Sequence, residues 1–248
     1  MKIYRVGVVS YLNSKPFLEG ILHDPIIRQI HLQVLPPAEI AALLVSGELD
    51  IGLVPVKVMH SLSNPHIHTN YCIGSTDKVH SVCIFSNTPI EHCHTLLLDS
   101  ESRTSVALSK VLLRDYFKLT PALKPSYVGY ESDLQDGVAG LVIGDRSFAW
   151  HKVYPYVYDL GYYWKKLTGL PFVYAAWLSN TPLESEFTIA FNRALENGLN
   201  RINDWLPPFQ TLYPDISLNN YFTKHISYQL DQEKRNGLAL FLEKSREF

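Results

Sequence analysis

The stretch VGVVSYLNSKPFLEGIL, residues 6–22, contains the structural unit on which the first half of the chain is built. Residues 6–10 form a short β-branched run that predicts a strand. Residues 14–22 predict a helix with Pro16 in its first turn, where proline is tolerated. The polar turn that contains Asn13 joins the two, and the order of strand, turn and helix indicates an α/β protein.

The same alternation recurs along the chain. The first half contains further strand candidates at residues 31–35, 51–54, 71–73 and 79–85 and helix candidates at 38–49 and 56–62. From residue 95 the pattern restarts, with expected strands at 95–98, 126–130, 140–143 and 171–178 and expected helices at 104–117 and 133–136. After residue 180 the pattern is helical, with helices expected within 187–205, 218–226 and 231–243. Two successive α/β units followed by helices predict two lobes with parallel-rich sheets.

The composition is globular, with 46% hydrophobic and 19% charged residues in 248. The 22 Lys and Arg against 24 Asp and Glu give a formal charge of −2, so the basic excess that a nucleic-acid or anionic-membrane partner requires is missing. The apolar run after Met1 is too brief for an export signal, and no apolar stretch approaches the roughly 18 residues of a membrane span. Cys72, Cys83 and Cys93 form no CxxC pair, which fits a reducing compartment, and we therefore expect a cytoplasmic protein.

Several common catalytic motifs are absent from the sequence. It contains no GxGxxG, GxxxxGK[ST], HExxH or GxSxG, which leaves nicotinamide, phosphoryl-transfer, zinc-protease and α/β-hydrolase chemistry without support. His66 and His68, like His92, Cys93 and His94, lack a carboxylate or a second cysteine at metal-ligand spacing. We therefore expect neither a cofactor nor a metal.

Polar segments follow the predicted strands, at the points where each strand ends. Ligands of parallel sheets bind beyond the carboxyl ends of the strands and beside helix N-termini. The segments at these positions are residues 10–14, 54–56, 74–75, 102–105 and 144–145. They offer mostly neutral hydroxyls, one amide and backbone N–H groups, a composition that suits recognition of a carboxylate.

Six segments stand out when they are taken together: SYLNSKP (10–16), GELDIGLVP (47–55), DSESRTS (99–105), Gly144-Asp145, DLG (159–161) with Trp164, and TGLPF (168–172) with Trp177. In combination they resemble the chorismate dehydratase family of the futalosine route to menaquinone. The combination is specific because SYLNSKP and SRTS recur together in that family at about this separation. The sister enzyme, 1,4-dihydroxy-6-naphthoate synthase, opens its first loop with a Cys-Pro-Asn-Asp-type turn, which this chain lacks.

The resemblance implies a type II periplasmic-binding-protein-like fold, in which two α/β lobes close over a central cleft. We expect the chain to cross between lobes near residues 86–95 and 178–181. Lobe I then comprises residues 1–88 plus 179–248, including the C-terminal helices, and lobe II comprises residues 89–178.

The resemblance also implies a reaction: chorismate loses water to give 3-[(1-carboxyvinyl)oxy]benzoate. Loss of the C3 proton and the C4 hydroxide makes the ring aromatic, so no redox cofactor is required. Two other classes stay open. One is an enzyme of the same pathway similar to 1,4-dihydroxy-6-naphthoate synthase, and the other is a non-catalytic protein that binds a small carboxylate.

The resemblance makes Asn13 the leading catalytic candidate, since its amide can polarise the C4 hydroxyl or fix the reactive conformer; helix capping is the structural alternative. Thr104 and Ser105 open a helix after a strand, where hydroxyls and N–H groups can bind a carboxylate, although Ser102 or Thr104 can equally act as an N-cap. The expected substrate-binding residues are Ser10, Tyr11, Ser14, Pro55, Ser81, Ser102, Arg103, Thr104, Ser105 and Asp145.

Three of these residues have a structural alternative: Arg103 can pair with Asp99 or Asp145, Asp145 can cap the next turn, and Ser81 can face a backbone group. The matched segments contain no histidine, and Glu48, Glu101 and Lys15 are their only glutamates and lysine. We therefore hypothesise that the enolpyruvyl carboxylate of the substrate takes the C3 proton, with Asp145 as the competing protein base.

Overall fold

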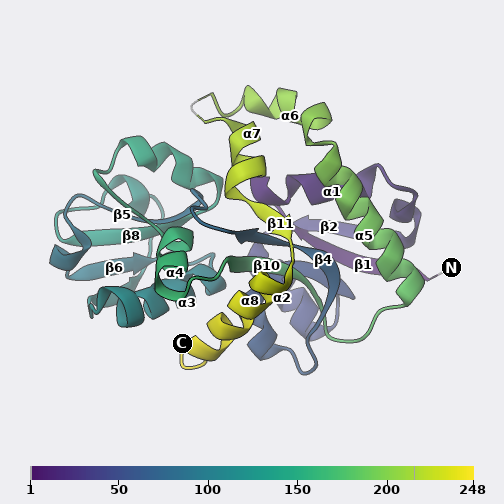
Figure 1. Ribbon diagram of the computed structural model, residues 1–248, viewed down its shortest axis with the longest axis horizontal. Helices are drawn as coiled ribbons and strands as arrows, with labels where there is room; N and C mark the ends of the chain where they lie inside the picture. The colour runs from purple at the N-terminus through teal and green to yellow at the C-terminus, as the bar shows by residue number, and fades with distance from the viewer. Residues whose placement is uncertain (1, 215) are drawn as a thin grey trace. The chain divides into compact units, whose positions relative to one another are not determined.

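Two β-sheets organise the chain, and each belongs to one of two units of the computed structural model, which describes residues 2–214 and 216–248 (Figure 1). Unit 1 comprises Met1–Gly74 and Val173–Gln232, and unit 2 comprises Ser75–Phe172 and Glu233–Phe248. The predicted α/β class is confirmed, because both units combine a sheet with helices.

The sheet of unit 1 has the strand order β11-β4-β10-β3-β1-β2. Strands β1 (Tyr4–Val9), β2 (Ile30–Leu35) and β3 (Ile51–Pro55) are parallel, whereas β10 (Phe172–Ser179) is antiparallel to β3 and β11 (Ser227–Gln229) is antiparallel to β4 (His66–Ser75). The helices are α1 (Lys15–Leu22), α2 (Pro37–Ser46), α5 (Ser185–Asn200), α6 (Ile202–Gln210) and α7 (Leu218–Asn220). Short helical turns complete the unit: η1 (Leu12–Ser14), η2 (Pro25–Gln29), η3 (Val56–Ser61) and η8 (Tyr221–His225).

The sheet of unit 2 has the strand order β7-β6-β8-β5-β9. Strand β6 (Thr95–Leu98) is parallel to β7 (Ala122–Pro125) and β8 (Val138–Ile143), whereas β5 (Val82–Ser86) is antiparallel to β8 and β9 (Tyr156–Asp159). The helices are α3 (Arg103–Leu112), α4 (Leu160–Thr168) and α8 (Gln232–Lys244), of which α8 starts at the boundary with unit 1. The shorter turns are η4 (Ile90–His92), η5 (Leu113–Phe117), η6 (Tyr130–Ser132) and η7 (Asp145–Lys152).

The unit boundaries differ from the expected lobe boundaries in both sheets. Strand β5 falls in unit 2 rather than with residues 1–88, because it is hydrogen-bonded between β8 and β9. Most of β10, expected in lobe II, falls in unit 1, because Ala175 and Trp177 pair with Pro55 and Leu53 of β3.

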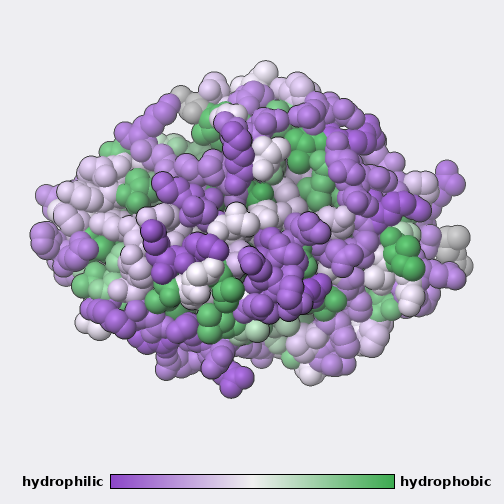
Figure 2. Space-filling view, in the orientation of Figure 1, coloured by the Kyte–Doolittle hydropathy of each residue, from purple (hydrophilic) through white to green (hydrophobic). Residues whose placement is uncertain are grey.

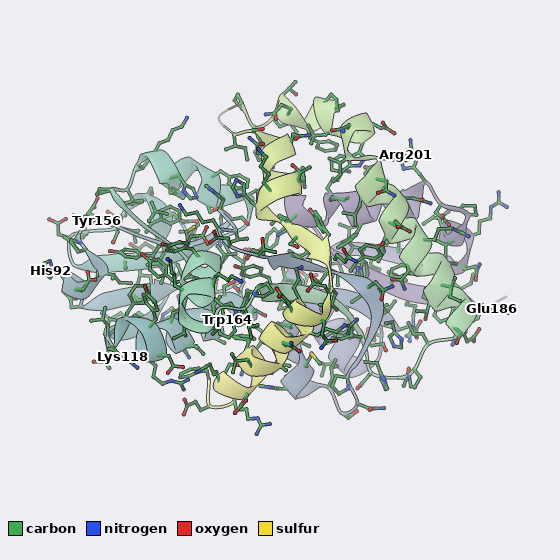
Figure 3. The ribbon with its side chains drawn as sticks, in the orientation of Figure 1. His92, Lys118, Tyr156, Trp164, Glu186 and Arg201 are labelled. Carbon is green, nitrogen blue, oxygen red and sulfur yellow. The ribbon has the colours of Figure 1, made fainter. Side chains whose placement is uncertain are left out.

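The C-terminal helix α8 also falls in unit 2, although residues 179–248 were expected in lobe I. Phe241 packs edge-on against Trp164 of α4 (labelled in Figure 3) and against Phe172, at ring-centroid distances of 6.1 and 4.9 Å. The chain therefore passes from unit 1 back to unit 2 once more, at Gln232–Glu233.

One expected strand is displaced. Residues 126–130 were expected to be extended, but β7 ends at Pro125 and the following segment turns into η6. The parallel register of β7 with β6 explains the shift, since Thr95–Leu98 pairs with Ala122–Pro125 and leaves no partner strand beyond Leu98.

Hydrophilic residues cover most of the face in Figure 2, and the apolar residues there stand in small separate groups. Within the described part of the chain, no helix is long and apolar enough to cross a membrane.

Helices α1 and α5 of unit 1 approach each other at two glycines (Figure 1). A Cβ on Gly198 would lie 2.0 Å from the carbonyl oxygen of Pro16 and 2.7 Å from the backbone nitrogen of Gly20. The two backbones are therefore in direct contact, which fixes the position of α1 and of the turn that precedes it.

We expect Gly198→Ala to lower the free energy of unfolding by about 1–3 kcal/mol, because the added methyl group forces the two helix backbones apart. Asn200→Ala, at an exposed position of the same helix, is the control and should change the urea midpoint little. Equal midpoints for the two variants would contradict the close packing of α1 on α5.

Candidate functional site

In unit 1, the predicted site residues gather where β1 and β3 end. The parallel register pairs Val6 with Ile51 and Gly7 with Gly52. Strand β1 ends at Val9, directly before Ser10, and β3 ends at Pro55, so both residues lie at the carboxyl ends of neighbouring parallel strands. Tyr11, Asn13 and Ser14 follow in the turn η1, directly before α1. The structure therefore brings the five predicted residues of this unit to one edge of its sheet.

Ser14 closes this turn onto the strand before it. Its side chain is buried, and the hydroxyl oxygen lies 2.5 Å from the carbonyl oxygen of Val9 and 2.7 Å from that of Tyr11. The hydroxyl donates its single hydrogen to these carbonyls. Ser14 is thus bonded to main chain, and its expected role as a direct substrate contact remains a prediction.

Asn13 carries a buried amide oxygen, Oδ1, that has no hydrogen-bond partner among the described residues. Neither η1 nor α1 has a side-chain N-cap bond in the described part of the chain, so the amide does not cap a helix. Leaving a buried acceptor unpaired costs about 1–3 kcal/mol, which a hydrogen-bond donor from a ligand would recover. The main-chain carbonyl of Asn13, in contrast, accepts a 2.8 Å hydrogen bond from the Tyr228 hydroxyl.

In unit 2, the segment SRTS lies where β6 leads into α3. Ser102 is the N-cap, and its hydroxyl oxygen accepts a 3.0 Å hydrogen bond from the backbone N–H of Ser105. Thr104 and Ser105 are buried in the first turn, and the Arg103 side chain is exposed. The capping alternative for Ser102 is thus realised, and the positive end of the α3 dipole lies beside three hydroxyls and a guanidinium.

Arg146 forms an ion pair with the loop that precedes α3. This arginine is not among the site residues predicted from the sequence. Its guanidinium pairs with the fully buried carboxylate of Asp99, and also with Glu131 at 2.9 Å. The carboxylate of Asp99 further accepts hydrogen bonds from the Tyr130 hydroxyl, at 3.2 Å, and from the backbone N–H of Glu101, at 2.9 Å. Arg146 therefore pairs with Asp99, which the sequence analysis considered as a partner of Arg103. The position of Arg146 directly after the matched pair Gly144-Asp145 is the sequence feature that could have indicated it.

Burial raises the pKa of Asp99, and the Glu101 N–H and Arg146 oppose this shift only in part. Burial also raises the pKa of Tyr130, so its hydroxyl stays protonated and remains a donor. This network ties the loop between β6 and α3 to η7, which begins with Asp145.

Ser81 and Asp145 lie at the same end of the antiparallel pair of β5 and β8. The backbone N–H of Gly144 donates a 2.8 Å hydrogen bond to the carbonyl oxygen of Ser81, and Ser81 is buried. Gly144 has a φ of 69°, a conformation that favours glycine and turns the chain out of β8. Since β6 and β8 are parallel, Ser81, Asp145 and the SRTS segment share one edge of this sheet.

Asp159 fixes the segment that leads to Ser81. Its carboxylate caps α4 by accepting from the N–H groups of Gly161 and Tyr162, and it also accepts from those of Val79 and His80, all at 2.8–3.2 Å. Burial raises the pKa of Asp159 even though these N–H groups favour the ionised form. The Asp-Leu-Gly segment of the sequence is thus an anchor for a neighbouring loop as well as a helix start.

Metal-ligand clusters and pockets elsewhere in the described chain do not point to a second site. Among residues 2–214 and 216–248, no group of three or more His, Cys, Asp and Glu side chains is placed to hold a metal ion. Two pockets of unit 1, of about 330 and 610 Å³, border α5 and include none of the predicted site residues.

The fold is periplasmic-binding-protein-like, as expected. The protein AF1704 from Archaeoglobus fulgidus matches with a TM-score of 0.72 at 11% identity, over 98% of this chain and 96% of that one. The CA3427 gene product of Candida albicans, described as having the generic periplasmic binding protein fold, matches with a TM-score of 0.68 at 12% identity, over 100% of this chain and 91% of that one.

The chain also matches a protein family described as menaquinone biosynthesis over residues 4–247, and it belongs to that family. The chorismate dehydratase of Thermus thermophilus is 29% identical over 272 aligned residues, which cover 98% of this chain and 95% of that protein. These matches confirm the resemblance predicted from the SYLNSKP and SRTS segments.

We expect Arg146→Met to lower the free energy of unfolding by about 2–3 kcal/mol at neutral pH, because it leaves the Asp99 carboxylate buried without its cation. The loss should shrink as the pH falls toward 4. The pKa of Asp99 in the folded state is already raised, and it rises further without Arg146. As the pH falls, the buried carboxylate of the folded variant is therefore protonated before that of the unfolded chain, which removes the uncompensated charge.

Arg246→Met, at an exposed arginine of the same unit, is the matched control. Urea unfolding at several pH values measures both variants, and Asp99→Asn combined with Arg146→Met should recover part of the loss. A pH-independent deficit in Arg146→Met would show that Asp99 does not depend on this arginine.

Proposed function

We propose that this protein is a chorismate dehydratase, a carbon–oxygen lyase that converts chorismate to 3-[(1-carboxyvinyl)oxy]benzoate and water in menaquinone biosynthesis through futalosine. The observation that carries the proposal is the buried, unpartnered amide oxygen of Asn13 in the SYLNSKP turn. Similarity to the Thermus thermophilus enzyme over 98% of the chain supports it. We also propose a cytoplasmic location, which the free thiols of Cys72, Cys83 and Cys93 support because they fit a reducing compartment.

The chemistry makes three demands on the protein. Chorismate carries a ring carboxylate and an enolpyruvyl carboxylate, both of which must be bound. The C3–H bond must point toward a base, and the C4 hydroxide must leave. Aromatisation of the ring supplies the driving force, so correct placement of the substrate accounts for much of the catalysis.

In unit 2, we assign carboxylate binding to the start of α3. Thr104 and Ser105 contribute hydroxyl groups, the first turn contributes N–H groups, and the exposed Arg103 contributes a positive charge. A carboxylate at a helix N-terminus gains about 0.3–1 kcal/mol at an exposed position and more where it is partly buried. Ser81, Ser102 and Asp145, at the same edge, complete the substrate-binding set proposed for this unit.

In unit 1, Asn13 is the proposed catalytic residue. Its buried Oδ1 can accept the hydrogen of the C4 hydroxyl, which holds the leaving group in one orientation. We propose that the ring is bound by residues near Asn13 in the same turn and at the end of the neighbouring strand β3. These residues are Ser10, Tyr11, Ser14 and Pro55.

The proposed base is the enolpyruvyl carboxylate of the substrate. Among the proposed site residues, Asp145 is the only side chain that could serve as a general base, whereas the others are neutral or cationic. The substrate carboxylate takes the C3 proton, the C3–H electrons form the ring double bond, and the C4–O bond breaks. Proton and hydroxide together leave as water, so no further reactant is needed.

Incubation with chorismate should give an aromatic product lighter by one water, detectable by ultraviolet absorbance and mass spectrometry. Asn13→Ala should lower kcat by about 100-fold, because the leaving group loses the hydrogen bond that holds its orientation. Asn200→Ala should leave turnover unchanged. Binding of chorismate without conversion would indicate a small-carboxylate-binding protein. Conversion only of a later, futalosine-derived compound would indicate an enzyme similar to 1,4-dihydroxy-6-naphthoate synthase.

A chorismate analogue with the enolpyruvyl carboxylate replaced by a carboxamide should bind yet not react, because the amide cannot accept the C3 proton. The competing assignment makes a different prediction: Asp145→Asn abolishes turnover of chorismate while binding is kept. Single-turnover measurements of both, with isothermal titration for binding, separate the two bases. Normal turnover of the carboxamide would eliminate the substrate as base.

A further inference from the structure

We propose that Tyr228 is a positioning residue for Asn13: its hydroxyl fixes the main chain of the SYLNSKP turn so that the Asn13 amide is presented to the substrate in one orientation. This inference rests on the proposed function of Asn13. It assigns a role to a residue 215 positions away in the sequence, on strand β11 of the unit 1 sheet.

The contact is a single, well-defined hydrogen bond. The Tyr228 hydroxyl donates to the main-chain carbonyl oxygen of Asn13 at 2.8 Å. The side chain is 8% exposed, and burial raises the pKa of Tyr228 well above its ordinary value, so the hydroxyl stays protonated and remains a donor. Because this buried hydroxyl donates to the main-chain carbonyl of Asn13, it restrains the turn and leaves the side-chain amide of Asn13 available to a ligand.

The position of Tyr228 explains how it reaches the turn. Strand β11 pairs with β4 at Ser227 with Gly74 and at Gln229 with Tyr71, and the register shifts between these pairs, at Tyr228. Irregularities of this kind redirect a side chain relative to the regular strand. The Tyr228 ring packs edge-on against Phe17 of α1 at a centroid distance of 5.2 Å, so the ring contacts the helix while its hydroxyl contacts the turn.

Ser14 holds the same turn from its other side. Its hydroxyl is bonded to the carbonyls of Val9 and Tyr11, which ties the turn to the end of β1. With the Asn13 carbonyl bonded to Tyr228, the turn is held by hydrogen bonds at the Tyr11 and Asn13 carbonyls, while the buried Oδ1 has no hydrogen-bond partner among the described residues. This is the arrangement expected of a group held in advance for a ligand, because a misplacement of about 1 Å can cost roughly 100-fold in rate.

Tyr228→Phe tests the proposal, since it removes only the hydroxyl and keeps the ring. We expect kcat to fall about 10- to 100-fold with KM changed less than about twofold, because the turn loosens while the other substrate contacts remain. In an Asn13→Ala background the same substitution should have no further effect on kcat. Tyr71→Phe is the matched control, because its ring also lies edge-on to Phe17, at 6.3 Å, and it belongs to the neighbouring strand.

A second measurement is independent of activity. The side-chain amide resonances of Asn13, assigned in the ligand-free protein by nuclear magnetic resonance, should be one sharp pair in the wild type and in Tyr71→Phe. In Tyr228→Phe they should broaden or shift. Wild-type kcat together with an unchanged Asn13 amide in Tyr228→Phe would overturn the positioning role. Failure of the wild type to convert chorismate would overturn the proposed function, while the resonances would still test whether Tyr228 orders the amide.

Discussion

The parallel pairing of β1 with β3 and of β6 with β8 is the constraint on which the candidate site depends. Parallel strands end at a common edge, so a turn that follows one strand lies beside the turn that follows its neighbour. Val6 and Val8 of β1 are fully buried, as is most of β3, so these strands cannot slide without exposing the core. The position of each polar turn is therefore set by the register of a buried sheet.

The two units stabilise these turns with different chemistry. Unit 2 uses buried carboxylates, because Asp99 and Asp159 accept backbone N–H groups of the loops that precede α3 and β5. Unit 1 uses hydroxyls, because Ser14 and Tyr228 donate to carbonyls of the turn before α1. A buried carboxylate is stable only with several donors or a cation, which explains why Arg146 accompanies Asp99. The hydroxyls that hold the unit 1 turn are neutral, so their burial requires no countercharge of this kind.

Local patterns in the sequence were sufficient to predict the strands at residues 51–54 and 140–143, and the family resemblance selected the SRTS segment and Asn13. The unit boundaries could not be predicted, because β5 has the same apolar pattern whichever sheet it joins and only its bonds to β8 and β9 decide the matter. Strand β11 has three residues, too few to show the alternation of a strand, so the contact of Tyr228 with Asn13 could not be predicted from the sequence. The role of Arg146 could not be predicted either, because its ion pair with Asp99, 47 residues away in the sequence, depends on how two loops pack together.

Part of the excess of tyrosine, 15 residues against 13 glycines, has a physical reason in such contacts. Irregular loops contain main-chain groups that no strand partner satisfies, and each one that is buried must find another bond. A tyrosine ring fills the core while its hydroxyl reaches such a group: Tyr228 donates to Asn13, Tyr154 donates to the Glu131 carbonyl, and Tyr158 accepts from the Ile90 N–H. Phenylalanine would fill the same space but leave those groups unpaired, which costs about 1–3 kcal/mol each. Tyrosine therefore links the packed interior to the loops.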